Sequence, residues 1–148
     1  MENTLLSTLI ALFPKNTSMQ LPPNIFIDME GEFTEFIKDE KLVARFPNKE
    51  RYANPFGFMQ GGMIVAAMDN TLSPLSYANA TANIMSEIKT SFKRPIKATD
   101  RFIEVIATVL NITATHITLQ ANVLNEKGKL AATGIAECVI IKGNRQPN

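Results

Sequence analysis

The stretch that decides the fold spans residues 52–86 and reads YANPFGFMQGGMIVAAMDNTLSPLSYANATANIMS. Asp69 is its single charged residue, and the residues around it are apolar on almost every side of a helix. A helix that is hydrophobic all round is usually buried, so the pattern predicts a buried central helix over residues 61–78. A carboxylate there is costly unless it is paired or faces a site that uses it. Asp69 is therefore either a structural acid, held by the backbone or by Asn70 and Thr71, or a functional group.

The composition of the whole chain is that of an ordinary globular protein. Its 148 residues are 45% hydrophobic and 20% charged, which suits one domain, spanning 1–148, that needs no metal or disulfide. The net charge of +1 argues against nucleic acid as the main partner. Cys138, the one cysteine, lies in a strand-like run and is expected to be a small core residue rather than a nucleophile. We expect no metal site and no cofactor.

The N-terminal residues predict a short amphipathic helix. Four leucines and Phe13 share one face of a helix over residues 1–13, which Pro14 ends. This segment has no basic residue, is too short to span a bilayer and lacks a cleavage signature, so we expect a soluble cytoplasmic protein that does not bind membranes. Residues 15–23 and 47–55 are expected to be loops.

Six stretches outside the central helix have the alternation or the composition of β-strands. They span residues 32–38, 41–46, 87–94, 101–111, 116–123 and 130–141. Short turns join consecutive stretches, which predicts antiparallel pairing. Because so apolar a helix must be covered, the sequence predicts an α+β fold in which a curved antiparallel sheet wraps around it. Gly134 indicates a bulge or a close backbone approach within the last strand, and residues 143–148 are expected to form a frayed tail.

The start of the central helix carries two glycines, and no Ser, Thr, Asp or Asn stands at the expected N-cap. The first amides of a helix are orphan donors with a partial positive charge. Gly61 and Gly62 would let a polar atom of another molecule approach these amides, which suits a developing oxyanion. Two alternatives stay open. Gln60 could cap its own helix while the glycines only allow tight packing, or the loop could bind phosphate, although it lacks a Gly-Lys-Ser/Thr ending.

The spacing between Gly61 and Asp69 has a consequence for assembly. The two residues are eight positions apart, which is about 12 Å along one helix. One reacting carbonyl group cannot touch both. If they cooperate, Gly61 of one subunit must meet Asp69 of another, as in a homodimer with two equivalent sites across a two-fold axis. Two such dimers could also pair into a tetramer.

Several motifs together resemble those of the hotdog-fold acyl-CoA thioesterases, and most closely the phenylacetate-pathway type. The resemblance covers roughly residues 33–141. Its motifs are Asn54-Pro-Phe-Gly57, Gln60-Gly-Gly62, the acid Asp69, Ser91-Phe-Lys-Arg-Pro95 and Asn125-Glu-Lys-Gly-Lys-Leu130. The resemblance implies a sheet wrapped around a central helix and hydrolysis of an acyl-CoA thioester to free acid and coenzyme A.

The resemblance also implies roles for individual residues. The Gly61 amide would polarise the thioester carbonyl, and Asp69 of the neighbouring subunit would act as nucleophile or as general base for water. Asn54 would position the water or the acid. Gly57 and Gly62 are expected to contact the substrate.

Two positions depart from the family pattern. Gln60 stands where the family usually has His; it can donate a hydrogen bond but cannot shuttle a proton. Met85 stands where the family often has Ser or Thr, and Ser86, one residue further, would point to the other face of a strand. We expect Gln60 to be among the catalytic residues, and Met85 and Ser86 to contact the substrate. The alternative function is an acyl-CoA or acyl-chain binding module with little or no turnover.

The remaining polar candidates carry less weight. His116, the only histidine, lies on the polar face of a predicted strand and is expected at the surface, which disfavours a multi-histidine metal site and hydratase chemistry. A basic cluster forms either a solvated face or a contact for the phosphates of coenzyme A. Its members are Lys89, Lys93, Arg94 and Lys97.

Overall fold

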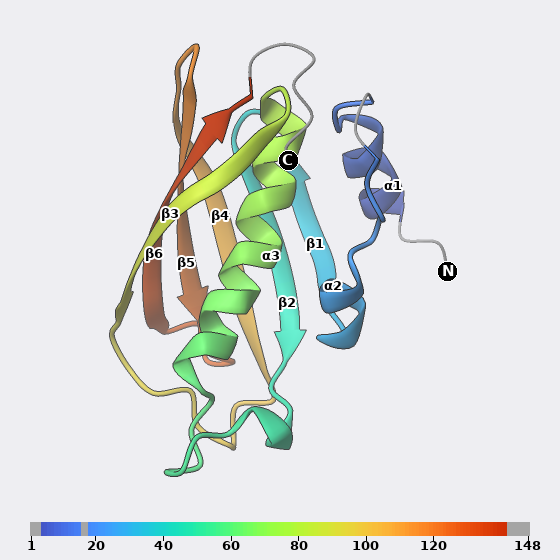
Figure 1. Cartoon of the computed structure of the whole chain (residues 1–148). Helices are drawn as coiled ribbons and strands as arrows, with labels where there is room; N and C mark the ends of the chain where they lie inside the picture. The colour runs from blue at the N-terminus through green and yellow to red at the C-terminus, as the bar shows by residue number, and fades with distance from the viewer. Residues whose placement is uncertain (1–3, 16–17, 142–148) are drawn as a thin grey trace.

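The computed structural model describes residues 4–15 and 18–141, and it contains a six-stranded antiparallel sheet and one long helix. The strands are β1 (Glu32–Ile37), β2 (Lys41–Pro47), β3 (Asn83–Phe92), β4 (Phe102–Ile112), β5 (His116–Leu124) and β6 (Leu130–Ile140). Their order across the sheet is β1-β2-β4-β5-β6-β3, so β1 and β3 are the edges. The helix α3 (Gly61–Asn79) lies along the concave face of the sheet (Figure 1). The predicted α+β hotdog arrangement is confirmed.

The bounds of α3 and of five strands lie within one residue of those predicted, α1 ends two residues before the predicted end, and β3 differs most. It starts four residues before the predicted strand, at Asn83, and its first half is paired with β6 through Met85. Ser86 is the extra residue of a β-bulge, since Met85 pairs with Cys138 and Glu87 pairs with Glu137. The predicted strand missed this half because it carries little alternation of its own.

Strand β5 shows how the sequence pattern places the core. Ile117, Leu119, Ala121 and Val123 are all fully buried, and the residues between them are half-buried. The buried face of the sheet packs against α3, because strand side chains alternate between the two faces. The alternation read from the sequence is therefore the one that the fold uses.

The sheet buries one side of helix α3. The sheet covers Ile64, Met68 and Leu72, which are at most 3% exposed. On the opposite side Gly62 and Asp69 are exposed, and Val65, Ala66 and Ser73 are only half-buried. The expectation of a helix buried on all sides is therefore wrong for the single chain. One sheet can cover only one side of a helix, and the apolar residues on the far side are left for another surface.

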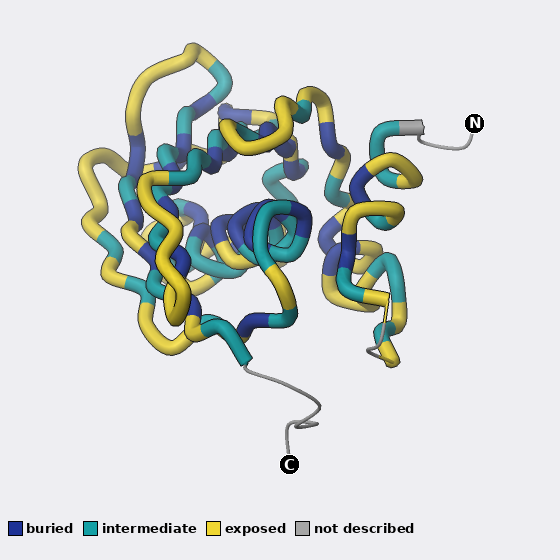
Figure 2. Tube along the Cα trace, turned by 90° about the horizontal axis from the view of Figure 1, so that it is seen from above, coloured by how far each residue is buried: buried dark blue, intermediate teal, exposed yellow. Residues whose placement is uncertain are grey.

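The N-terminal segment covers a second side of α3. It contains α1 (Thr4–Ala11) and the five-residue helix α2 (Asn24–Asp28), which the sequence did not predict. Figure 2 looks along α3 and shows the strands on one side of it and this segment on the other. The predicted packing of α1 on the body is confirmed, since Leu9 and Phe13 are buried. Residues 1–3 of the predicted helix and the predicted tail at 143–148 lie outside the described residues.

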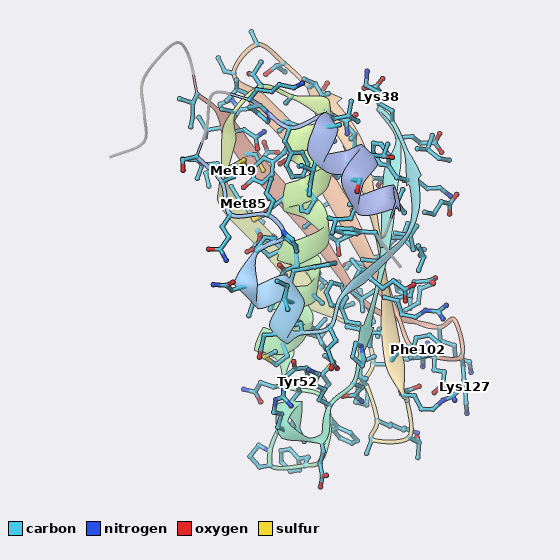
Figure 3. All side chains as sticks on the ribbon, turned by 90° about the vertical axis from the view of Figure 1, so that its right-hand side faces the viewer. Met19, Lys38, Tyr52, Met85, Phe102 and Lys127 are labelled. Carbon is cyan, nitrogen blue, oxygen red and sulfur yellow. The ribbon has the colours of Figure 1, made fainter. Side chains whose placement is uncertain are left out.

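Two smaller points complete the fold. The predicted loop at 47–55 contains a single 3-10 turn, η1 (Glu50–Tyr52), which buries Tyr52 at the end of the molecule where α3 begins (Figure 3). None of the helices that the structure describes is long and apolar enough to cross a membrane.

Gly134 is where α3 comes closest to the sheet. It pairs regularly with Thr90 and Ala121, so no bulge lies there. A Cβ atom at this position would lie 2.9 Å from the sulfur of Met68. The close-approach interpretation is therefore the correct one, because the Met68 side chain occupies the space that a side chain at this position would fill.

We expect Gly134→Val to lower the free energy of unfolding by about 1–3 kcal/mol, because the added carbons overpack the space that Met68 fills. Urea denaturation at fixed protein concentration measures the change. Ile135→Val, at an exposed neighbouring position, should stay within about 0.5 kcal/mol of wild type. Equal stability of the two variants would contradict this account of the helix–sheet contact.

Candidate functional site

The first turn of α3 leaves backbone amides unused. The carbonyl of Gln60, the N-cap residue, accepts from the amides of Met63 at 2.9 Å and Ile64 at 3.3 Å. The amides of Gly61 and Gly62 have no acceptor among the residues that the structure describes. The Gln60 side chain makes no capping hydrogen bond, so the alternative in which Gln60 caps its own helix is wrong. Two donors with a partial positive charge therefore stand open at the helix start.

The loop before the helix is held by one side chain. The Asn54 Oδ1 atom accepts from the amides of Phe56 at 2.9 Å and Phe58 at 3.1 Å. Gly57, at φ 82°, closes the turn and donates its amide to the Asn54 carbonyl at 2.9 Å. This conformation requires glycine there, since other residues rarely adopt a positive φ. Within the described chain, the Asn54 side-chain nitrogen has no partner and can donate to another molecule.

A cavity of about 360 Å³ opens beside the helix start, and we call it the helix-start pocket. Its lining combines apolar side chains with two cations. The lining residues are Asn54, Phe58, Met59, Gly61, Ile64, Phe92, Lys93, Arg94, Pro95 and Ile96. The amides of Lys93 and Arg94 both donate to the Ala131 carbonyl, at 2.7 and 3.2 Å, which fixes the backbone that carries the two cations.

The basic cluster predicted from the sequence divides in two. Lys93 and Arg94 line the helix-start pocket, are exposed, and form no ion pair within the described part of the chain. Lys89 pairs instead with Glu87 at 3.6 Å, and neither Lys89 nor Lys97 lines the pocket. Because cations and open amides both favour negative charge, the helix-start pocket suits an anionic group or a developing oxyanion.

Asp69 lies in a different cavity, of about 340 Å³, which we call the acid pocket. The pocket lies between α3, β1 and the N-terminal segment, and its walls are mostly apolar. The lining residues are Leu6, Ile10, Phe13, Leu21, Pro22, Pro23, Ile25, Phe26, Phe33, Ala66, Asp69, Asn70, Ser73, Pro74 and Tyr77.

The carboxylate of Asp69 is exposed, and its one hydrogen-bond partner among the described residues is the hydroxyl of Ser73, which donates to Oδ1 at 2.8 Å. Asn70 and Thr71 do not hold it. The Asn70 side chain donates to the Ala66 carbonyl at 2.8 Å, and the Thr71 hydroxyl donates to the Ala67 carbonyl at 2.9 Å. The interpretation of Asp69 as a buried structural acid is therefore wrong for the single chain, and the carboxylate remains accessible.

Ser73 and Tyr77 are site residues that the sequence reasoning missed. They follow Asp69 at intervals of four, so the three side chains form one row along α3. Burial, and then the charge of Asp69, raise the pKa of Tyr77, while a hydrogen bond with Ser73 lowers it. Tyr77 is thus a neutral phenol at physiological pH. The spacing of four from the lone acid was the signal that could have pointed to Ser73.

The predicted site residues do not all come together in one chain. Asn54 and Gly61 share the helix-start pocket, and Asp69 lies in the acid pocket; the two pockets have no residue in common. Two further predicted residues, Met85 and Ser86, line neither pocket. Met85 (labelled in Figure 3) packs against the core, and the Ser86 hydroxyl donates to the Glu137 carbonyl at 3.1 Å.

The other predicted contacts lie near the pockets without lining them. Gln60, Gly57 and Gly62 are exposed around the helix start. His116 is exposed, as expected, with its Nδ1 atom 2.8 Å from the Thr115 hydroxyl.

Cys138 behaves as a core residue. It is 1% exposed, and burial raises the pKa of its thiol to about 11. Its thiol therefore stays protonated and shielded at neutral pH, which disfavours a nucleophilic role. No cluster of three His, Cys, Asp or Glu residues that could hold a metal ion occurs in residues 4–15 and 18–141.

Several solved structures resemble this fold. The PaaI protein of the Escherichia coli phenylacetic acid degradation operon is 16% identical and matches with a TM-score of 0.77, covering 82% of this chain and 87% of that one. The thioesterase HI1161 of Haemophilus influenzae is 18% identical, with a TM-score of 0.75 and coverage of 88% and 98%. A mutant form of thioesterase PA1618 from Pseudomonas aeruginosa is 20% identical, with a TM-score of 0.74 and coverage of 92% and 93%. At these identities the likeness shows the hotdog fold alone.

Sequence comparison identifies the family as well as the fold. A protein of Saccharolobus solfataricus named "Putative esterase SSO2140" is 29% identical over 104 residues, which are 69% of this chain and 73% of that protein. A family model described as the thioesterase-like superfamily matches residues 29–147 and so covers β1 to β6 and α3. The chain belongs to the thioesterase-like superfamily.

Proposed function

We propose that the protein hydrolyses an acyl-CoA thioester to a free acid and coenzyme A. Its family supports thioester hydrolysis as the general reaction. The observation that carries the proposal is that α3 bears two reactive groups. Open amides begin the helix at Gly61, and an accessible carboxylate follows at Asp69. These are the two groups that attack on a carbonyl requires: a donor for the oxygen and a base or nucleophile for the carbon.

The helix-start pocket receives the thioester and the coenzyme. The Gly61 amide donates to the carbonyl oxygen, where the helix dipole stabilises the negative charge that develops during attack. In this proposal the Asn54 side-chain nitrogen, which lines the pocket, holds the attacking water or Asp69, and exposed Gln60 supplies a further donor beside the pocket. Lys93 and Arg94, both without an ion pair in the described chain, contact the phosphates of coenzyme A.

Asp69 promotes the attack on the carbonyl carbon, either as a general base or as the nucleophile. As a general base, its carboxylate takes a proton from water while the water oxygen bonds to the carbon. The carbon–sulfur bond then breaks, and the protonated Asp69 gives this proton to the leaving sulfur, so that coenzyme A leaves as its thiol. As a nucleophile, the carboxylate bonds to the carbonyl carbon and the carbon–sulfur bond breaks, so that coenzyme A leaves as a thiolate, which takes a proton from solvent. Water then hydrolyses the resulting anhydride to the free acid and restores the Asp69 carboxylate. In either case the hydroxyl of Ser73, 2.8 Å from Oδ1, keeps one carboxylate oxygen in place and leaves the other free to react.

The working unit is a homodimer. Gly61 and Asp69 are held about 12 Å apart along α3 and cannot meet at one carbonyl within a chain. The exposed side of α3, with Gly62 and Asp69, is the surface that a second helix would cover. Edge strand β3 offers a place for a second copy to pair, and it exposes Ile84 and Phe92, at 49% and 54%. Two antiparallel α3 helices across a two-fold axis bring Gly61 of each subunit to Asp69 of the other. A dimer of dimers is compatible with this unit.

Asp69→Asn should lower kcat for acyl-CoA hydrolysis by about 10²- to 10⁴-fold, because the amide can neither accept a proton nor attack. Release of thiol, followed with DTNB over short, long and aromatic acyl-CoA substrates, measures it. Cys138 does not interfere, because it is buried and its pKa is about 11.

The matched control for this experiment is Asp39→Asn. Asp39 lies exposed in the β1–β2 turn at φ 65°, a conformation that Asn tolerates, and its activity should equal wild type. Full activity of a folded Asp69→Asn protein would overturn the mechanism. Tight acyl-CoA binding by the wild-type protein without thiol release would favour the binding-module alternative instead.

Ser73→Ala should lower kcat by about 10- to 100-fold with little change in KM, because a hydrogen bond to a charged group is lost while substrate contacts remain. Ser73→Thr keeps the hydroxyl and should restore most of the rate. Steady-state kinetics on all three proteins tests this positioning role. If the Thr variant were as slow as the Ala variant, the hydroxyl would not be the relevant group.

Gly61→Val and Asp69→Asn should complement each other when their subunits are mixed, although each homodimer is inactive. Random mixing makes half of the dimers hybrid, and each hybrid has one intact site, so activity should return to about a quarter of wild type. Co-expression with two different affinity tags isolates the hybrid for assay. A hybrid without activity would place Gly61 and Asp69 of the same chain in each site.

A further inference from the structure

We infer that the acid pocket binds the acyl group of the substrate and that its size selects medium-chain fatty acyl groups. The inference rests on the proposed hydrolysis, since it places the acyl chain next to Asp69. It adds a substrate class, and it assigns the choice of acyl group to the N-terminal segment, which we define as residues 4–15 and 18–28.

The chemistry of the pocket fits a hydrocarbon. Leu6 and Ile10 of α1 face Ala66 and Pro74 of α3 across it, and aromatic rings complete the walls. The polar side chains in the lining all come from one helix, α3, and Asp69 is the only charged one. A ligand here is therefore apolar over most of its surface, with its polar end at the carboxylate.

The length of the pocket favours a chain over a small ring. The lining on α3 continues from Asp69 to Tyr77, a rise of about 12 Å, which matches an extended acyl chain of about eight to ten carbons. At the Tyr77 end the ring of Phe13 packs edge-to-face on the Tyr77 ring, with 5.5 Å between centroids. A volume of about 340 Å³ is at the small end of the range for ligand pockets. The space thus suits one chain of limited length.

The wall that limits the chain lies outside the matched family region. The family match begins at residue 29, after both α1 and α2. Figure 3 views the molecule from the side on which these two helices lie over α3. Phe26 of α2 stacks on Phe33 of β1, at 4.6 Å between centroids, which fixes the segment to the sheet edge. The N-terminal segment therefore acts as a specificity-determining wall added to a shared catalytic scaffold.

Variants of Ile10 test the assignment. Its side chain is half-buried and lines the pocket from α1. Wild-type kcat/KM should rise by about fourfold per added methylene from butanoyl-CoA to about decanoyl-CoA, since each methylene becomes buried. Ile10→Trp should lower kcat/KM for decanoyl-CoA by at least about tenfold and leave butanoyl-CoA within about twofold. Ile10→Ala should move the optimum to longer chains.

The matched control is Ser7→Trp, which introduces the same side chain at an exposed position of α1 outside the pocket. Its chain-length profile should equal that of wild type. Two results would overturn the assignment of the pocket. One is an equal loss of kcat/KM for all chain lengths in Ile10→Trp, and the other is the same change of the chain-length profile in Ser7→Trp.

A binding measurement separates this inference from the proposed hydrolysis. S-decyl-CoA and S-ethyl-CoA are thioethers that cannot be hydrolysed, and calorimetry gives their affinities. Tighter binding of S-decyl-CoA that Ile10→Trp abolishes would support the acyl pocket even if no thioester were cleaved. Cleavage of all thioesters without any dependence on chain length, together with equal binding of the two thioethers, would refute the pocket and leave the hydrolase.

Discussion

The packing of α3 against the sheet is the contact on which the rest of the structure depends. Gly134 lets the helix lie so deep that Met68 fills the space where a side chain would stand. One side of the helix is thereby committed to the core, and the row that carries Asp69, Ser73 and Tyr77 must face away from it. The helix is thus both the centre of the core and the carrier of the reactive groups. Its rigidity fixes how far apart those groups lie.

The sequence was sufficient for the architecture because its signals were local. Alternation in β5, the turn at Asn125–Gly128 and the uninterrupted apolar run of α3 each depend on residues close in the chain. The same is true of the open amides at Gly61, since the absence of a capping residue is visible in the sequence. The distance between Gly61 and Asp69 followed from the helix rise alone. The start of β3 was missed because an edge strand with a bulge has little pattern to show.

The parts that the sequence did not reveal depend on residues far apart in the chain. The exposure of Asp69 depends on which parts of the fold pack against α3. Its apolar neighbours in the sequence suggested that it is buried, but the sheet does not cover the side of α3 on which Asp69 lies. The acid pocket joins α1, α2, β1 and α3, so no single stretch indicates it. The five residues of α2 bury only Phe26, too few positions for a periodic pattern. Tertiary contact, rather than propensity, decides each of these features.

The place of α1 in the fold has a consequence for how such a protein can change over time. Helix α1 is not a member of the sheet, and its side chains reach the acid pocket from outside the helix that carries Asp69. Substitutions in α1 therefore alter the shape of the pocket without disturbing a strand pairing or the reactive row on α3. Mutations in α1 can therefore change the preferred acyl group while the residues of α3 that carry out the reaction stay the same. Proteins descended from one ancestor can in this way come to prefer different substrates and still catalyse the same reaction.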